Sequence, residues 1–188
     1  DAVLDVLRER VAAGVDVRIM YDDLGCLLTL PVGYQKTLRS YGIKCEVFNR
    51  FHPFLTTLQN NRDHRKIAVI DGKIAYTGGI NLADEYINEK LRFGHWRDCG
   101  VRMQGGAAES FTAMFLQTWH LLSRTREPLR DLITERDTAT PSDGWVQPYA
   151  DSPMDKIHTG ERIYMHAISR SQKSLYITTP YMTVGEEM

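Results

Sequence analysis

The stretch that decides the fold is HRKIAVIDGKIAYTGGIN, residues 64–81. Two apolar runs, Ile67–Ile70 and Ile74–Thr77, flank a turn built on Asp71-Gly72. Asp-Gly between apolar runs is the strongest short-range signal for a β-hairpin, because both residue types tolerate the positive φ angles of a tight turn. Both arms are apolar at nearly every position, so we predict central strands covered by helices rather than an exposed ribbon.

Helical and strand patterns alternate upstream of the hairpin. Apolar residues recur every three or four positions in the predicted helices, and they alternate with polar residues in the first predicted strand. The predicted elements are a helix over 2–11 with Val3, Leu4, Leu7 and Val11 on one face and Gly14 as C-cap, a strand over 15–21, a helix over 34–41 closed by Gly42, and a strand over 44–49. This alternation favours an α/β layer architecture.

The pattern continues downstream and then weakens. We predict a short helix over 82–87, a strand over 98–104, and an amphipathic helix with Phe111, Phe115, Thr118, Trp119 and Leu122 on its apolar face. Residues 123–143 are rich in charged residues, Thr and Pro, which is typical of a linker or crossover. A strand over 145–149, a helix over 157–168 and a strand over 174–179 would follow. The expected domains are 1–122, truncated at its N-terminus, the linker 123–143, and an incomplete second domain over 144–188.

Composition excludes several classes of protein. Lys and Arg number 23 and Asp and Glu 24, so the net charge of -1 does not indicate a dedicated duplex-binding protein. Cys26, Cys45 and Cys99 are widely spaced and never in CxxC form, so we predict neither a disulfide framework nor a zinc site. We expect the protein to work in a reducing compartment. No apolar run approaches the roughly 20 residues that cross a bilayer, so we expect this chain to be soluble. Because it begins at Asp1 inside a helical pattern, we expect a piece excised from a longer protein.

Several polar groups are expected at one end of the hairpin. His64 and Lys66 are two residues apart, so in an extended strand both side chains project to the same face. The returning strand passes through Gly78 and Gly79, whose missing side chains allow close approach to the backbone, and it brings Asn81 to the same strand end. An ammonium, an amide donor and accessible N–H groups around an imidazole predict a phosphate pocket.

These residues resemble the phospholipase D superfamily, whose signature is HxK(x)4D followed by GGxN. His64, Lys66 and Asp71 match the first part of the signature, and residues 78–81 match the second. The runs that look specifically like a bacterial cardiolipin synthase are NNRDHRK at 60–66, NLADEY at 81–86, HWRD at 95–98, YDD at 21–23 and TPY at 179–181. The resemblance implies an α/β fold, a layered mixed β-sheet flanked by helices, followed by the start of a second similar domain.

The resemblance also implies a reaction and a set of catalytic residues. His64 would attack a phospholipid phosphodiester and form a phosphohistidine, which splits one difficult displacement into two easier ones. Lys66 and Asn81 would hold the nonbridging oxygens of the phosphate. Asp98 would hydrogen-bond the far nitrogen of the His64 ring and fix its tautomer. This scheme requires no metal and no cofactor.

Other positions of the signature receive smaller roles. The backbone of Gly78 and Gly79 would serve the phosphate. Asp71 lies in the turn, roughly 20 Å along the strand from His64, and is assigned to structure. Arg62 and Arg65 are candidates for attracting anionic lipid, the alternative being two exposed charges. Asp98 could instead form an ordinary ion pair with Arg97 or Arg102. Asp22 and Asp23 could contact a glycerol hydroxyl, whereas His95, Trp96, His120, His158 and His166 are assigned to packing or structure.

The chain contains one signature, whereas the family joins two in one active site. We therefore expect the chain to be inactive or weak unless the missing half of its parent, or a second copy of the chain, supplies the other histidine. The implied partners are phosphatidylglycerol or another phospholipid, and the anionic membrane surface at which the bacterial parent works. Two alternatives remain: a phosphodiesterase or nuclease of the same superfamily, although the net charge makes nucleic acid the weaker choice, and a non-catalytic half-domain that binds phosphate or lipid.

Overall fold

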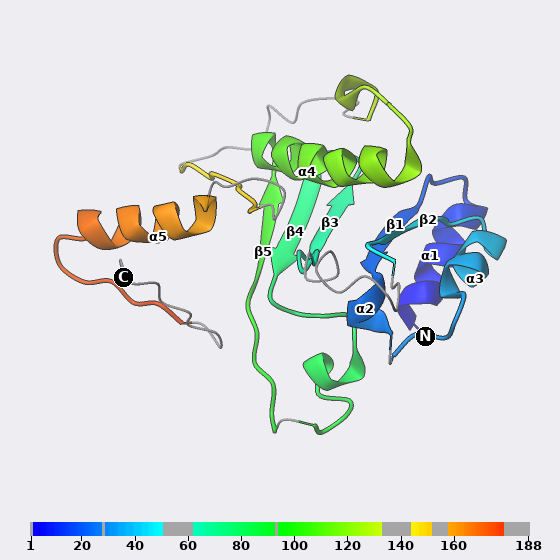
Figure 1. Ribbon diagram of the computed structural model, residues 1–188, viewed down its shortest axis with the longest axis horizontal. Coiled ribbons are helices and arrows are strands. Elements are labelled where there is room, and N and C mark those ends of the chain that lie inside the picture. The colour runs from blue at the N-terminus through cyan, green and yellow to red at the C-terminus, as the bar shows by residue number, and fades with distance from the viewer. Residues whose placement is uncertain are drawn as a thin grey trace. The chain divides into compact units, whose positions relative to one another are not determined.

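The computed structural model describes residues 2–27, 29–50, 62–92, 94–132, 144–151 and 158–178. The chain divides into two compact units, Asp1–Val146 and Gln147–Met188 (Figure 1). The first unit is a mixed α/β structure with two small sheets flanked by helices. It carries every residue of the expected phosphate pocket.

The first sheet of this unit is a parallel pair. Helix α1 (Ala2–Ala12) leads into β1 (Arg18–Asp22), a single turn of helix α2 (Asp23–Cys26) follows, and α3 (Tyr34–Ser40) precedes β2 (Lys44–Phe48). Strands β1 and β2 run parallel, with Arg18 opposite Lys44 and Asp22 opposite Phe48. The predicted alternation of helices and strands is confirmed here.

A tight apolar cluster fixes these helices on the parallel pair. Leu38, Ile43 and Cys45 are at most 2% exposed. Around them pack Leu4, Leu7 and Val11 from α1, Val17, Ile19 and Tyr21 from β1 and its approach, and Tyr34 and Tyr41 from α3 and its end. The expected apolar face of α1 is therefore correct except at Val3, which is 49% exposed.

The second sheet contains the predicted hairpin. Strands β3 (Ile67–Ile70), β4 (Ile74–Gly78) and β5 (Gly100–Gln104) pair antiparallel in that order. At the turn, Asp71 and Gly72 both have positive φ, 54° and 66°, and Lys73 N–H donates to the Ile70 carbonyl at 3.0 Å. Positive φ at both central residues defines a type I′ turn, whose twist matches that of the strands.

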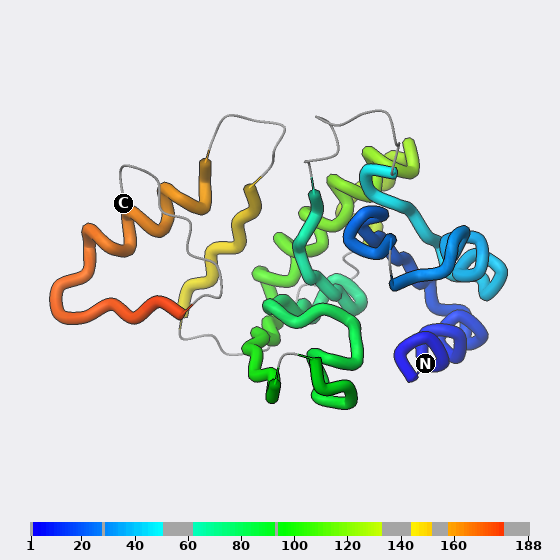
Figure 2. Tube along the Cα trace, turned by 60° about the horizontal axis from the view of Figure 1, so that its bottom comes forward, coloured from blue at the N-terminus to red at the C-terminus, as the bar shows by residue number. Residues whose placement is uncertain are grey.

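Only one face of this sheet is covered in the described part of the chain. Helix α4 (Gly106–Ser123) lies across the three strands and also contacts β2, as Figures 1 and 2 show. Ala75, Met103, Ala108 and Phe111 form the core between sheet and helix. Ile70 and Tyr76 on the other face are 49% and 41% exposed, so the prediction that both faces are buried is wrong. The strands alternate between a covered and an open face, as period-two geometry requires.

The remaining elements are short. Between β4 and β5 the chain leaves the sheet and forms a 3-10 turn, η2 (Asp84–Ile87), and another, η3 (Leu129–Asp131), follows α4. In the second unit, α5 (Thr159–Arg170) confirms the predicted helix, shifted by two residues. The strands predicted over 145–149 and 174–179 are wrong for the residues described, because 145–149 and 174–178 form no ladder. Residues 133–143 of the predicted linker lie outside the described residues.

None of the helices among the described residues is both long enough and apolar enough to cross a bilayer.

Candidate active site

His64 and Lys66 lie immediately before β3, at the end of the hairpin opposite the turn. The strand begins at Ile67, so both residues are in extended chain that leads into it rather than in the ladder itself. The His64 side chain is exposed and that of Lys66 is half-buried. The Lys66 Nζ donates to the His64 carbonyl at 2.6 Å, which ties the ammonium to the backbone of the histidine.

Asp63 and Arg65 hold the backbone on either side of His64. The Arg65 N–H donates to Asp63 Oδ1 at 3.1 Å, and the Arg65 guanidinium donates to the same carboxylate through Nε at 2.8 Å. Arg65 Nη2 also donates to the Thr118 hydroxyl on α4 at 2.8 Å. The pKa of Asp63 is lowered because, although burial raises it, hydrogen bonds and the positive charge of Arg65 outweigh burial. His64 is therefore the central residue of an Asx turn that is anchored to a buried helix.

Asp22, at the end of β1, reaches the same segment from the other sheet. Its Oδ2 accepts the Asp63 N–H at 3.1 Å, and its Oδ1 lies 3.2 Å from the Arg62 guanidinium. Arg62 and Arg65, expected to bind phosphate, thus both have carboxylate partners within the protein. We interpret both arginines as holding the histidine segment in place.

Gly78 and Gly79 allow β5 and the residues before it to approach the end of β4 closely. A Cβ on Gly78 would lie 2.6 Å from the Cys99 carbonyl oxygen and 3.0 Å from Gly100 Cα. A Cβ on Gly79 would lie 2.6 Å from Asp98 Oδ1. Contacts of that length do not occur in proteins, so glycine at both positions lets the strand end close and brings the Asp98 carboxylate against the Gly79 backbone.

Asp98 is held by its own segment. Its Oδ2 accepts the Trp96 indole N–H at 3.0 Å, and its Oδ1 accepts the Cys99 N–H at 2.8 Å. The Asn88 carboxamide in turn bonds both the N–H and the carbonyl of Trp96, at 2.7 and 3.0 Å. Within the described part of the chain no hydrogen bond joins Asp98 to His64, the partner that the resemblance implies.

The electrostatics of the site favour a neutral imidazole beside a cation. Burial lowers the pKa of His64, the charge of Lys66 lowers it further, and the charges of Asp22 and Asp63 act in the opposite direction. Burial also lowers the pKa of Lys66, against the charges of Asp63 and Asp98. A neutral ring nitrogen is a competent nucleophile near pH 7, and an adjacent ammonium can bind a phosphate.

The structure brings together most, but not all, of the predicted residues. His64, Lys66, Gly78, Gly79 and the chain entering Asn81 lie at one end of the hairpin, with Asp98 against Gly79. Asn81 is half-buried and Asp71 is in the turn at the other end. Sequence analysis missed the bonds of Asp22 to the histidine segment. The available signal was an aspartate at the carboxyl end of a strand, where α/β sheets place functional groups.

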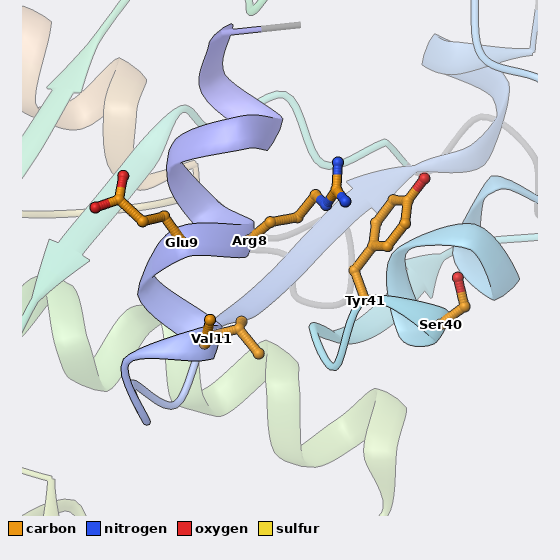
Figure 3. Close-up of a pocket in the computed structure, with 6 residues that line it drawn as sticks. Arg8, Glu9, Val11, Ser40 and Tyr41 are labelled. Atoms are coloured by element: carbon orange, nitrogen blue, oxygen red, sulfur yellow. The ribbon is translucent and has the colours of Figure 1, made fainter.

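Two hollows in the described part of the chain lie away from His64. One hollow, of about 430 Å³, lies between α1 and α3. The Arg8 guanidinium lies 4.5 Å from the centre of the Tyr41 ring there, and Figure 3 shows both side chains. Another hollow, of about 450 Å³, is lined by residues such as Lys44, Trp119 and Glu127. Neither is lined by His64. Among the described residues no cluster of three or more His, Cys, Asp or Glu side chains could hold a metal ion.

Comparison with known proteins identifies a family and several relatives. The family model described as cardiolipin synthase, phospholipase D-like domain, matches residues 1–119. An uncharacterised protein of Streptococcus mutans is 44% identical over 186 residues, which are 99% of this chain and 40% of that protein. Cardiolipin synthases of Alkalihalophilus pseudofirmus and Staphylococcus aureus are 32% and 34% identical, over 99% and 95% of this chain and 37% and 36% of their own lengths. The chain thus spans 36–40% of the length of these relatives.

Proposed function

The chain belongs to the family of cardiolipin synthase phospholipase D-like domains, and from that premise we propose that it carries one of two half-sites of a phosphatidyltransferase. In this proposal the parent protein makes cardiolipin from two phosphatidylglycerol molecules through a phosphohistidine on His64. The observation that carries the proposal is the placement of His64, whose carbonyl accepts the Lys66 ammonium, at the end of the hairpin where the GGxN segment returns.

The reaction has two displacements at phosphorus. In the first, a ring nitrogen of His64 attacks the phosphorus of one phosphatidylglycerol. A P–N bond forms, the P–O bond to the glycerol headgroup breaks, and glycerol leaves with a proton from a general acid. In the second, the headgroup hydroxyl of another phosphatidylglycerol attacks the phosphorus and gives its proton to that same group. The P–N bond breaks, which releases cardiolipin and neutral His64.

The surrounding groups have complementary roles. The Lys66 ammonium and the Asn81 carboxamide would hold the nonbridging oxygens, on which negative charge is concentrated. The backbone at Gly78 and Gly79 would face the phosphate. Asp98, whose charge acts on Lys66, would keep the ammonium protonated and directed toward that phosphate. These residues all lie at one strand end, which supports the assignment.

The general acid would be a second histidine from another copy of the signature. The sequence contains one HxK(x)4D, and neither His158 nor His166 has a lysine two residues later. We propose that the remainder of the parent protein supplies this histidine, or that two copies of the chain meet about a twofold axis. The chain alone would then turn over phosphatidylglycerol slowly.

We further propose that the parent works at an anionic membrane surface. Support comes from the segment after Gly79, where Leu82 and Leu91 are 88% and 82% exposed and Ile87 is 59% exposed. Exposed apolar side chains beside a site that binds a lipid phosphate could contact the acyl chains of that lipid.

A substrate with a good leaving group tests the half-site without the second histidine. The chain is incubated with bis(p-nitrophenyl) phosphate, because nitrophenolate leaves without protonation. The protein is then analysed for an acid-labile p-nitrophenylphosphoryl group on histidine, which is the covalent label. We expect nitrophenolate release and label on His64. The label should be lost in His64→Ala and kept in His158→Ala, a histidine of the second unit outside the signature.

Parallel arms separate the alternatives. With phosphatidylglycerol vesicles we expect specific activity that rises with protein concentration, and with single-stranded DNA we expect no cleavage. Cleavage of DNA in preference to lipid would favour the nuclease. Binding of phosphate without any covalent label would favour a non-catalytic half-domain, and an unchanged label in His64→Ala would refute the assignment of the nucleophile.

A further inference from the structure

We propose that Asp22 is a positioning residue for His64: its carboxylate, at the end of β1, holds the histidine segment in place and adds to the negative charge of Asp63 near this imidazole. The inference rests on the proposed function for its catalytic meaning, but not for its geometry. The family signature lies wholly in the hairpin and the segment after it. The inference adds a residue of the parallel sheet to the site.

The contacts of Asp22 come from separate parts of the chain. Its side chain is 9% exposed. Oδ1 accepts the Gly25 N–H at 3.1 Å, which caps α2, and receives the Arg62 guanidinium at 3.2 Å. Oδ2 accepts the Asp63 N–H at 3.1 Å. A nearly buried carboxylate with donors on both oxygens has little freedom to move, so it serves as a fixed point for the donors it binds.

The Asp22 carboxylate is connected to His64 through Asp63. Asp22 holds the backbone N–H of Asp63, and the Asp63 carboxylate holds the backbone N–H of Arg65 at 3.1 Å. His64 lies between the two, and its carbonyl is held by the Lys66 ammonium. The backbone is therefore restrained before and after the histidine, although the imidazole itself is exposed. A misplacement of about 1 Å can cost about 100-fold in rate, so these restraints matter for an attack on phosphorus.

The charges around His64 point the same way. In the described part of the chain, the charged groups that act on it are Lys66 on its own segment, Asp63 beside it and Asp22 from β1. Asp98 acts on Lys66 instead. As the ring nitrogen attacks phosphorus the imidazole becomes positive, and a fixed carboxylate nearby stabilises that charge. Asp22 thus takes the electrostatic role that the resemblance gives to Asp98.

Histidine titration by NMR tests this without requiring turnover. The chain has six histidines, and the His64 ring signal is identified by its absence from the spectrum of His64→Gln. We expect Asp22→Asn to lower the pKa of His64, because a negative charge that favours the imidazolium is lost. The matched control is Asp98→Asn, which removes the same charge from a carboxylate that acts on Lys66. It should leave the pKa of His64 within error of the unmodified chain.

The outcomes separate this inference from the proposed function. A His64 pKa that moves with Asp98→Asn and not with Asp22→Asn overturns the inference, whether or not phosphohistidine forms. A titration as expected, without any phosphohistidine in the nitrophenyl assay, leaves the inference standing and counts against the proposed function. When both hold, Asp22→Asn should also slow labelling of His64 by about 10- to 100-fold.

A second variant covers the case in which Asp22→Asn does not fold. Arg62→Ala removes the positive charge paired with Asp22 and leaves the bond to Asp63 in place. The carboxylate then acts on His64 with less compensation, and the pKa of His64 should rise. An unchanged or lowered pKa in the folded Arg62→Ala chain would overturn the inference.

Discussion

The two ends of the β3–β4 hairpin are built in different ways. At the turn end, Asp71 and Gly72 take positive φ, Lys73 N–H donates to the Ile70 carbonyl, and the Lys73 carbonyl accepts one bond from the Gly105 N–H after β5. The other end is held by distant parts of the chain, with Asp22 from β1 and Thr118 from α4 bonding the His64 segment. Both ends belong to one signature, yet only the end that carries His64, Lys66 and the GGxN segment has the groups that the proposed chemistry needs. Residues close together in the sequence form the hairpin, whereas contacts with β1 and α4 position the His64 segment.

The largest expected difference between the two ends is catalytic. His64→Ala should abolish covalent labelling by bis(p-nitrophenyl) phosphate, a loss of at least about 1,000-fold, because the nucleophile is gone. Asp71→Asn removes the charge of the signature residue in the turn but keeps a residue that tolerates positive φ. It should label within about twofold of the unmodified chain, since turn positions far from the phosphate contribute little. Equal losses in both variants would show that Asp71 takes part in the site.

A pH profile of the same labelling reaction gives the next largest effect. Partial burial and the charge of Lys66 lower the pKa of His64 from its ordinary value, and in the proposed mechanism the neutral ring is the nucleophile. The rate should therefore rise about tenfold per pH unit below the lowered pKa of His64 and level off toward neutral pH. Asp71→Asn should leave the midpoint unchanged. A midpoint above pH 6.5 would contradict the electrostatic description of the site.

The contrast between the ends also explains what the sequence could predict. The turn, the hairpin and the helix–strand alternation follow from residues close together in the chain, and these predictions are confirmed. The bonds from Asp22 to Arg62 and Asp63 span about 40 residues, and no spacing rule announces them. The carboxylate partners of Arg62 and Arg65 were not predicted, because a sequence shows charge but not the internal group that contacts it. Their binding of lipid stays a prediction. The strand predicted over 145–149 is wrong because alternation alone does not supply a neighbouring strand.

The closure of the active end can be tested at Gly78. A Cβ there would press on the Cys99 carbonyl and Gly100 Cα, which are backbone atoms that cannot turn away. Gly78→Ala should therefore lower the free energy of unfolding by about 1–3 kcal/mol in urea denaturation, as overpacking does. The control is Gly106→Ala at the start of α4, where a Cβ meets nothing within 4 Å and the change should stay within about 0.5 kcal/mol. Similar values for the two variants would mean that β4 and β5 do not approach so closely.

The smallest expected effect isolates a single long-range bond. Thr118 and Thr112 are both buried on α4, but the Thr118 hydroxyl accepts a bond from Arg65 of the histidine segment, whereas the Thr112 hydroxyl donates to the Ala108 carbonyl one turn back. Replacement by valine keeps the shape and removes the hydroxyl in each case. Thr118→Val should cost about 1 kcal/mol and slow His64 labelling several-fold, because a guanidinium N–H loses its partner and the segment is less restrained. Thr112→Val should cost less and leave labelling unchanged, because the freed carbonyl keeps its bond within the helix. If the two variants label alike, the bond to α4 stabilises the fold without positioning the histidine. Of the two long-range contacts that hold the His64 segment in the described part of the chain, that of Asp22 would then be the one that positions it.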